Sequence, residues 1–328
     1  MSGAPATTLF SEVAGPGVRM PVAVVRAAAP GPAVVIGANL HGDECTGLGV
    51  VHALIRELPR RLVGGVVTLL PSLNPQGLEQ GTRRIAGDTA DPNRVFPGSA
   101  RGSLAERHAA RIWSEIVGRR PDLYIDLHTD TDGALPYAIV DRVVRGAGDG
   151  LEARCLAHAE ATGLTVLREY PADRYLRYEL DRSLPGALVN QGICPAFTIE
   201  LGPRRRVDPS AVAEMADAVW GVLGGLGVAD APQARHPSRR DGGPWRRESG
   251  PRTTRSGFLV PLRGPGAAFA AGDPLSEVRS LDGDVREVLR APADGFVVSL
   301  PEVARVDIGA ATATLAVREE RAPRATSG

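Results

Sequence analysis

The sequence contains no lysine, so all 38 of its basic residues are arginines. This absence excludes chemistry that needs a lysine amine, such as a Schiff base, a lysine-linked cofactor or the lysine of a phosphate-binding loop. The formal net charge is zero, so electrostatics gives no reason to expect nucleic acid or an anionic membrane as a partner. No apolar run approaches the roughly 20 residues that span a bilayer. We therefore expect neither nucleic-acid binding nor membrane association.

Cysteine is also scarce. Cys45, Cys155 and Cys194 are odd in number and widely spaced, which favours free thiols in a reducing compartment over disulfides or a cysteine metal site. The N-terminal segment has no charged start followed by an apolar run, so we expect no signal peptide. Together these features predict a cytoplasmic protein.

The residues that are present indicate an α/β fold. Hydrophobic residues make up 43% of the 328 residues, which is typical of a globular protein. Short apolar runs typical of buried strands alternate with segments whose apolar residues recur at helical spacing. The strand patterns cover 33–37, 66–70, 122–127 and 196–199, and the helical patterns 48–58, 104–118 and 209–223. We expect Pro59 to end the first helix and the capping box Ser103–Glu106 to open the second. This alternation predicts a mixed, mostly parallel sheet with helices on both faces.

The composition changes after about residue 228. Residues 229–256 are rich in Pro, Gly, Arg and Ser, which predicts a linker or mobile loop. Short strand patterns with Gly-Asp, Asp-Gly and Pro turns follow. We therefore expect a first domain over 1–228, a linker over 229–256, and a small all-β, barrel-like module over 257–328 with a frayed tail.

Two histidines and a glutamate form a candidate metal site. His41 and Glu44 directly follow the first strand pattern, and His128 ends a later one. At a spacing of three residues both side chains of the first pair can point to one side, and ligands bind at strand ends in open α/β sheets. Two imidazoles and a carboxylate are a common catalytic zinc set. From spacing alone, however, His41 capping a turn and Glu44 as a solvated first-turn carboxylate remain open alternatives.

The sequence resembles the succinylglutamate desuccinylase and aspartoacylase family of zinc hydrolases, which are related to metallocarboxypeptidases. The matching motifs occur in the family's order over about residues 33–225. They are His41-Gly42-Asp43-Glu44, Asn74-Pro75-Gln76-Gly77, Thr82-Arg83, Asp91-Pro92-Asn93-Arg94-Val95-Phe96-Pro97-Gly98, Asp126-Leu127-His128 and Thr198-Ile199-Glu200-Leu201-Gly202. The resemblance implies a zinc carboxypeptidase-like fold over 1–228, with the β module following it.

The resemblance also implies roles for individual residues. Its metal ligands are His41, Glu44 and His128, holding one zinc ion per subunit. Glu200 is then the general base, which also returns its proton to the leaving amine. Arg83 stabilises the tetrahedral oxyanion.

The resemblance assigns substrate binding to Asn93 and Arg94, which hold a substrate carboxylate. Arg84 is an alternative to its neighbour Arg83. Many relatives carry a basic residue about where Pro185 stands here, and Arg182 is a candidate replacement.

The expected activity is removal of an acyl group from an N-acyl amino acid or a close analogue. The substrate is then a small carboxylate-bearing amide. One alternative is a carboxypeptidase that cleaves a C-terminal residue, and another is a non-catalytic zinc or ligand-binding protein. Asp126 is either a partner of a ligand histidine or a carboxylate satisfied by backbone donors. Residues 170–178, rich in aromatic and arginine side chains, are either a lid or an ordinary surface loop.

The segment 291–298 resembles a turn and strand of biotinyl- or lipoyl-like barrels. Those modules carry their group on a lysine, so the missing lysine excludes that role. A lid, substrate gating or homo-oligomer formation through exposed sheet edges remains open.

Overall fold

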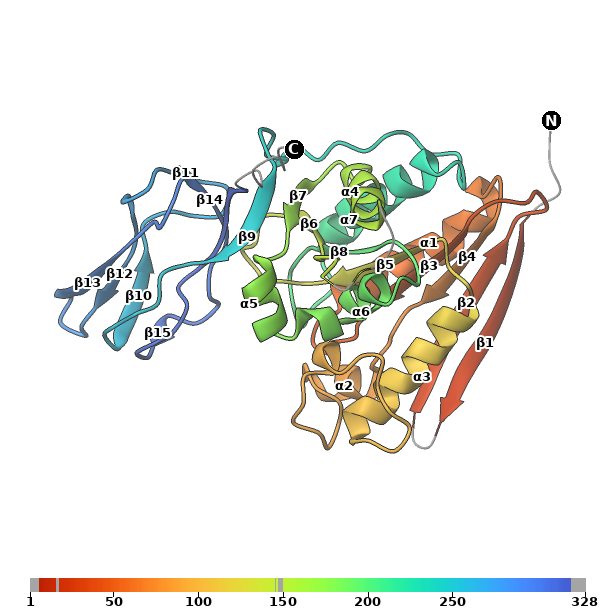
Figure 1. Ribbon diagram of the computed structural model, residues 1–328, viewed down its shortest axis with the longest axis horizontal. Helices are drawn as coiled ribbons and strands as arrows, with labels where there is room; N and C mark the ends of the chain where they lie inside the picture. The colour runs from red at the N-terminus through yellow and green to blue at the C-terminus, as the bar shows by residue number, and fades with distance from the viewer. Residues whose placement is uncertain (1–5, 16–17, 145, 147–149, 320–328) are drawn as a thin grey trace, which may run out of the picture.

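The computed structural model describes residues 6–15, 18–144, 146 and 150–319. A twelve-stranded sheet runs along the molecule, and a separate four-stranded sheet lies at the C-terminal end (Figure 1). The strand order is β1-β2-β4-β3-β5-β8-β6-β7-β9-β16-β14-β11 in the first sheet and β13-β12-β10-β15 in the second. The tail that we expected to be frayed lies, from residue 320, outside the described residues.

The elements have the following bounds. The strands are β1 (Thr7–Gly15), β2 (Val18–Arg26), β3 (Ala33–Ala38), β4 (Val66–Leu70), β5 (Leu123–His128), β6 (Tyr137–Val140), β7 (Thr165–Arg168), β8 (Ala196–Glu200), β9 (Trp245–Ser249), β10 (Gly257–Pro261), β11 (Ala268–Phe269), β12 (Pro274–Arg279), β13 (Val285–Arg290), β14 (Gly295–Ser299), β15 (Arg305–Val306) and β16 (Thr314–Arg318). The α-helices are α1 (Thr46–Arg61), α2 (Pro75–Gln80), α3 (Leu104–Gly118), α4 (Leu151–Glu160), α5 (Ala172–Arg177), α6 (Leu184–Asn190) and α7 (Pro209–Gly225), with 3-10 turns η1 (Pro92–Arg94) and η2 (Leu180–Arg182).

The central strands confirm the predicted mixed sheet. β4, β3, β5 and β8 run parallel, β6 is antiparallel to β8, and β7 and β9 run parallel to β6. The parallel strands are almost fully buried, as expected for strands covered on both faces.

Helices cover both faces of this part of the sheet. A Cβ added at Gly47 of α1 would lie 2.9 Å from the Cβ atom of Leu127, so α1 packs on the face that Leu127 occupies. Tyr124 is three residues earlier on β5 and therefore points to the other face. On that face, the Leu73 side chain lies near Tyr124 over Gly37. His108 of α3 forms a hydrogen bond of 2.5 Å with the backbone carbonyl of Leu73, so α3 packs on this second face.

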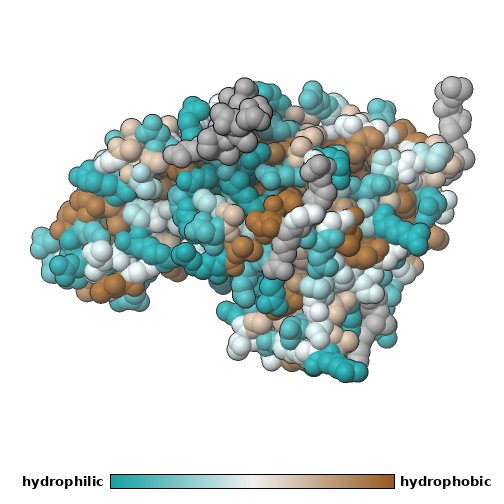
Figure 2. Space-filling model, in the orientation of Figure 1, coloured by the Kyte–Doolittle hydropathy of each residue, from teal (hydrophilic) through white to brown (hydrophobic). Residues whose placement is uncertain are grey.

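The C-terminal lobe (residues 257–319) is joined to the body by a shared sheet. β16, β14 and β11 extend the long sheet, while β10, β12, β13 and β15 form the outer one (Figure 1). The surface is hollowed below this lobe in the space-filling view (Figure 2). An apolar cluster with members on β6, β7, β14 and β16 spans the junction, so the lobe is packed against the body as well as tethered to it.

Two sequence-based expectations need correction. Residues 229–256, predicted to be a linker or mobile loop, contain β9, which pairs with β7 on one side and β16 on the other. Pro59 does not end α1, which continues to Arg61. The amide of Leu62 still donates a hydrogen bond to the carbonyl of Leu58 at 2.8 Å, so the last turn closes around the proline.

Among the described residues, no helix combines the length and apolar character needed to cross a bilayer. All three cysteines are free thiols, as expected.

Candidate metal centre and active site

A tightly held loop between β3 and α1 carries the first two candidate ligands. Asn39 has a φ of 58°, and its side-chain amide donates to the carbonyls of His41, Gly42 and Glu44 at 3.0–3.1 Å. A Cβ at Gly42 would lie 2.0 Å from the backbone of Gly77, so only glycine fits this contact. The His41-Gly42-Asp43-Glu44 motif is therefore shaped by the Asn74-Pro75-Gln76-Gly77 motif behind it.

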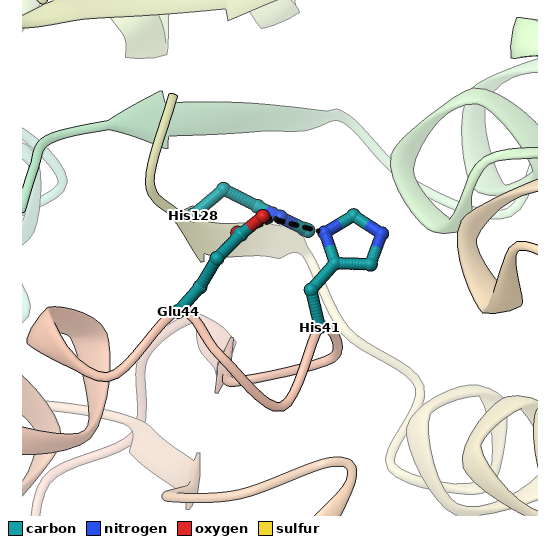
Figure 3. A group of neighbouring side chains, drawn as sticks. All are labelled: His41, Glu44 and His128. Carbon is teal, nitrogen blue, oxygen red and sulfur yellow. Dashed lines mark hydrogen bonds and ion pairs between the residues drawn. The ribbon is translucent and has the colours of Figure 1, made fainter. Parts of the chain in front are cut away.

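His41, Glu44 and His128 point toward one another across the end of β5 (Figure 3). Nδ1 of His41 lies 2.8 Å from Oε1 of Glu44, and Nδ1 of His128 lies 2.8 Å from Oε2. All three residues are buried, and one donor atom from each lies within 4.8 Å of the others. The structure thus brings together the three residues that the sequence predicted as ligands.

The second nitrogen of each imidazole contacts another carboxylate. Nε2 of His41 lies 3.1 Å from Asp91, and Nε2 of His128 lies 3.0 Å from Asp126. Such partners fix the ring orientation and leave the opposite nitrogen available for a metal. Of the two interpretations of Asp126, the structure supports the histidine partner.

The charges of this cluster are strongly interdependent. Burial opposes charge on Glu44, but His41 and His128 outweigh it and hold the pKa of Glu44 well below its usual range. Burial likewise opposes protonation of His128, yet Asp126 and Glu44 raise the pKa of His128 well above its usual value. The imidazoles of His41 and His128, together with the charged carboxylate of Glu44, form a set of donor atoms that fits zinc.

Glu200 lies beside this cluster at the end of the neighbouring strand. The register of β5 and β8 pairs His128 with Glu200, so both side chains leave the same face of the sheet. The Oε2 atom of Glu200 is buried and has no hydrogen-bond partner among the described residues. Burial raises the pKa of Glu200 to about 8. A buried carboxylate without a bonded partner is suited to exchanging a proton with a substrate or water.

A cavity of about 180 Å³ connects these groups. Arg83 lines it and bonds to Glu44 at 3.1 Å and to Asp91 at 3.0 Å. Asn93 and Arg94 also line it. Six of the sequence-predicted side chains therefore share one cavity with Glu200. They are His41, Glu44, Arg83, Asn93, Arg94 and His128.

Two predicted substrate-binding residues are not brought to the cavity. Arg84 is exposed, because its neighbour Arg83 turns inward at this point of the chain. The Arg182 side chain is 43% exposed and faces Glu179 at 3.5 Å. Neither lines the cavity among the described residues, so the structure does not bring them to the candidate site, and their roles in substrate binding stay predictions.

The segment 170–178 contains the short helix α5. A hydrogen bond of 2.6 Å joins Arg174 to Glu248 of β9, so this segment is fixed to the strand beside it. Its role as a lid stays a prediction.

Several cavity residues were missed by sequence reasoning. They are Asp130, Tyr137, Asp141, Glu169 and Arg247. Tyr137 and Asp141 are four residues apart on and just after β6, at the two-residue period that places side chains on one face of a strand. This two-residue spacing is the only sequence pattern that could have pointed to Tyr137 and Asp141. Arg247 lies on β9, in the segment predicted to be a linker, so no sequence pattern pointed to it.

Comparisons with known proteins identify relatives of this chain. A curated relative, the N-alpha-acetyl-L-2,4-diaminobutyric acid deacetylase of Halomonas elongata, is 32% identical over 129 residues, which are 39% of this chain and 37% of the relative. The matched region thus spans little more than a third of that relative's length.

Two solved structures share the fold over nearly the whole chain. The succinylglutamate desuccinylase/aspartoacylase of Rhodobacter sphaeroides superposes with a TM-score of 0.78 and 23% identity, covering 96% of both chains. The product-bound ectoine utilization protein EutE (DoeB) of Ruegeria pomeroyi gives 0.77 and 20% identity, covering 95% of both chains. Residues 30–226 match the succinylglutamate desuccinylase/aspartoacylase catalytic domain, and the chain therefore belongs to that family.

Proposed function

We propose that this protein is a zinc-dependent amidohydrolase that removes the acyl group from an N-acyl amino acid. The observation that carries the proposal is the convergence of His41, Glu44 and His128 in one cavity with Glu200, whose buried Oε2 atom has no hydrogen-bond partner among the described residues. Membership of a family of acyl-amino-acid hydrolases supports it, as does the relative named as a deacetylase.

The two histidines and Glu44 would hold the metal. A zinc ion bound there supplies a Lewis acid that polarises an amide carbonyl and lowers the pKa of a water molecule. Glu200 accepts the proton of the attacking water and passes it to the leaving nitrogen, because its raised pKa lets it carry that proton between the two steps.

The arginines orient the substrate and offset its developing charge. Arg83 lies against Glu44, so its guanidinium is placed to stabilise negative charge on the carbonyl oxygen. Arg94 is held by the carbonyls of Tyr178 and Asn93 at 3.0 and 2.6 Å, and it binds the carboxylate of the amino acid.

Replacing Glu200 by glutamine tests the mechanism. We expect kcat for a confirmed substrate to fall by about 10²–10⁴-fold, the usual contribution of general acid–base catalysis, while the zinc content stays at one ion per chain. Hydrolysis of N-acetyl and N-succinyl amino acids is followed by release of the free amine, and zinc by elemental analysis.

The matched control is Glu57→Gln, which alters an exposed carboxylate on α1 that pairs with Arg61. It should leave kcat unchanged. An unaltered kcat in Glu200→Gln would contradict the proposed proton transfer. Cleavage of dipeptides without any deacylation would instead favour a carboxypeptidase.

A further inference from the structure

Arg94 and Asp141 both line the cavity, and neither forms an ion pair within the described part of the chain. The guanidinium of Arg94 bonds only to backbone carbonyls. The carboxylate of Asp141 is 6% exposed and accepts one hydrogen bond of 2.9 Å from the hydroxyl of Tyr175. Buried charges are normally paired, so both groups have capacity for a charged ligand.

The other arginines of the cavity are already paired. Arg247 bonds to both carboxylate oxygens of Glu169, with Nε at 3.0 Å from Oε2. Arg83 contacts Glu44 and Asp91.

Among the other carboxylates of the cavity that form no ion pair, Glu200 lies beside the candidate metal ligands, whereas Asp130 has more hydrogen-bond donors than Asp141. It accepts a hydrogen bond of 3.1 Å from Tyr137 and is further stabilised by a hydrogen bond from Ser299. Asp141 is thus the less satisfied of the two anions.

Asp141 lies far from the catalytic end of the cavity. β6 is antiparallel to β8, with Tyr137 opposite Glu200. Asp141 follows Tyr137 by four residues, which places it about 13 Å further along the strand direction at about 3.3 Å per residue. A group bound at Asp141 therefore belongs to the end of the substrate that is remote from the scissile amide.

We propose that Asp141 is a specificity-determining residue that binds a cationic side-chain group of the substrate. The preferred substrates are then N-acyl amino acids that retain a free side-chain amine or guanidine, with the carboxylate on Arg94 and the cation on Asp141. This inference rests on the proposed deacylase function. An ammonium donates hydrogen bonds to the carboxylate and offsets the cost of keeping it charged in a buried site.

A matched pair of substrates tests this directly. Nα-acetyl-L-lysine carries an ammonium, and Nα-acetyl-L-norleucine is nearly the same shape without the charge. We expect kcat/KM of the wild-type enzyme to be at least about ten-fold higher for the lysine derivative, since a charged hydrogen bond contributes about 1.5–3 kcal/mol. In Asp141→Asn this ratio should fall at least ten-fold.

Asp173→Asn is the control, because its carboxylate on α5 is 70% exposed; it should keep the wild-type ratio. Calorimetric binding of free L-lysine against L-norleucine gives a second readout that does not need turnover, and Asp141→Asn should abolish the difference. Asp130→Asn distinguishes the two carboxylates.

The outcomes separate this inference from the proposed function. Equal kcat/KM for both derivatives in the wild-type enzyme overturns the role of Asp141 but leaves the deacylase intact. A lysine preference lost in Asp130→Asn and kept in Asp141→Asn also overturns it. No hydrolysis of any N-acyl amino acid overturns the proposed function itself, while the calorimetric comparison still reports on Asp141.

Discussion

Asp141 is held in a site that disfavours its charge. Burial, followed by the nearby negative charge of Glu169, raises the pKa of Asp141 to about 7, although Tyr175, Arg247 and Arg94 act in the opposite direction. The folded protein therefore binds this proton more tightly than the unfolded chain does. The resulting stabilisation is complete at pH below the ordinary carboxyl value and is lost as the pH rises through about 7.

Asp141→Asn removes this pH-dependent loss. We expect the stability of the variant relative to the wild type to increase by about 2 kcal/mol between pH 5 and pH 8. Urea denaturation of both proteins at the two pH values measures it. A stability difference that stays constant or decreases with pH would show that Asp141 is not held in this way.

At this same scale, the sequence predicted the residues of the candidate metal centre and missed those further along the cavity. His41, Glu44 and His128 sit in short local motifs, and the family resemblance added Glu200. Asp91 was visible in a motif but had no assigned role, because its contact with His41 joins residues 50 positions apart. Arg84 stayed an alternative to Arg83 because adjacent arginines look alike until the backbone direction is known.

At the scale of elements, the loop between β3 and α1 is the most constrained segment of the site. Gly42 lies against the backbone of Gly77, and any Cβ there would force a backbone shift. We expect Gly42→Ala to weaken zinc binding by at least about ten-fold, since displaced supporting groups typically cost 10–100-fold in metal affinity. Competition with a chromophoric chelator measures the affinity.

Gly118→Ala provides the matched control. This glycine is the last residue of α3, and an added Cβ would meet nothing within 4 Å. The variant should bind zinc as the wild type does and gain up to about 1 kcal/mol in stability. Equal zinc affinity in both glycine variants would mean that the loop does not depend on the Gly42–Gly77 contact.

Local sequence patterns predicted the long helices well, but they missed a strand that forms through pairing with distant strands. The capping box at Ser103 and the apolar spacing of α1, α3 and α7 located those helices, since both signals are contained within each element. β9 was missed because a segment rich in Pro, Gly and Arg becomes a strand only through its pairing with β7 and β16. Strand formation of this kind depends on tertiary context.

At the scale of the whole molecule, two of the apolar clusters in the C-terminal lobe should respond differently to mutation. Phe296 belongs to the cluster that also contains Tyr137 and Ile139 of the cavity wall. Phe296→Ala should cost about 3–5 kcal/mol and also lower kcat/KM, because it leaves a void behind that wall. Thermal unfolding and the hydrolysis assay measure the two effects.

Val278→Ala is the comparison, since Val278 is buried in the outer four-stranded sheet. It should destabilise the lobe by about 2 kcal/mol and leave kcat/KM unchanged. A loss of activity as large as that of Phe296→Ala would mean that the outer sheet, too, supports the cavity.

β9 links the body of the protein and the C-terminal lobe, because it pairs with β7 on one side and with β16 on the other. The strand completes the sheet of the body, and its Arg247 side chain lines the cavity that holds the catalytic groups. The lobe therefore cannot be exchanged between relatives as a self-contained unit, because its strand β16 pairs with β9 and places Thr314 in the same cavity. A chimera joined before residue 245 also acquires the donor's side chain at position 247.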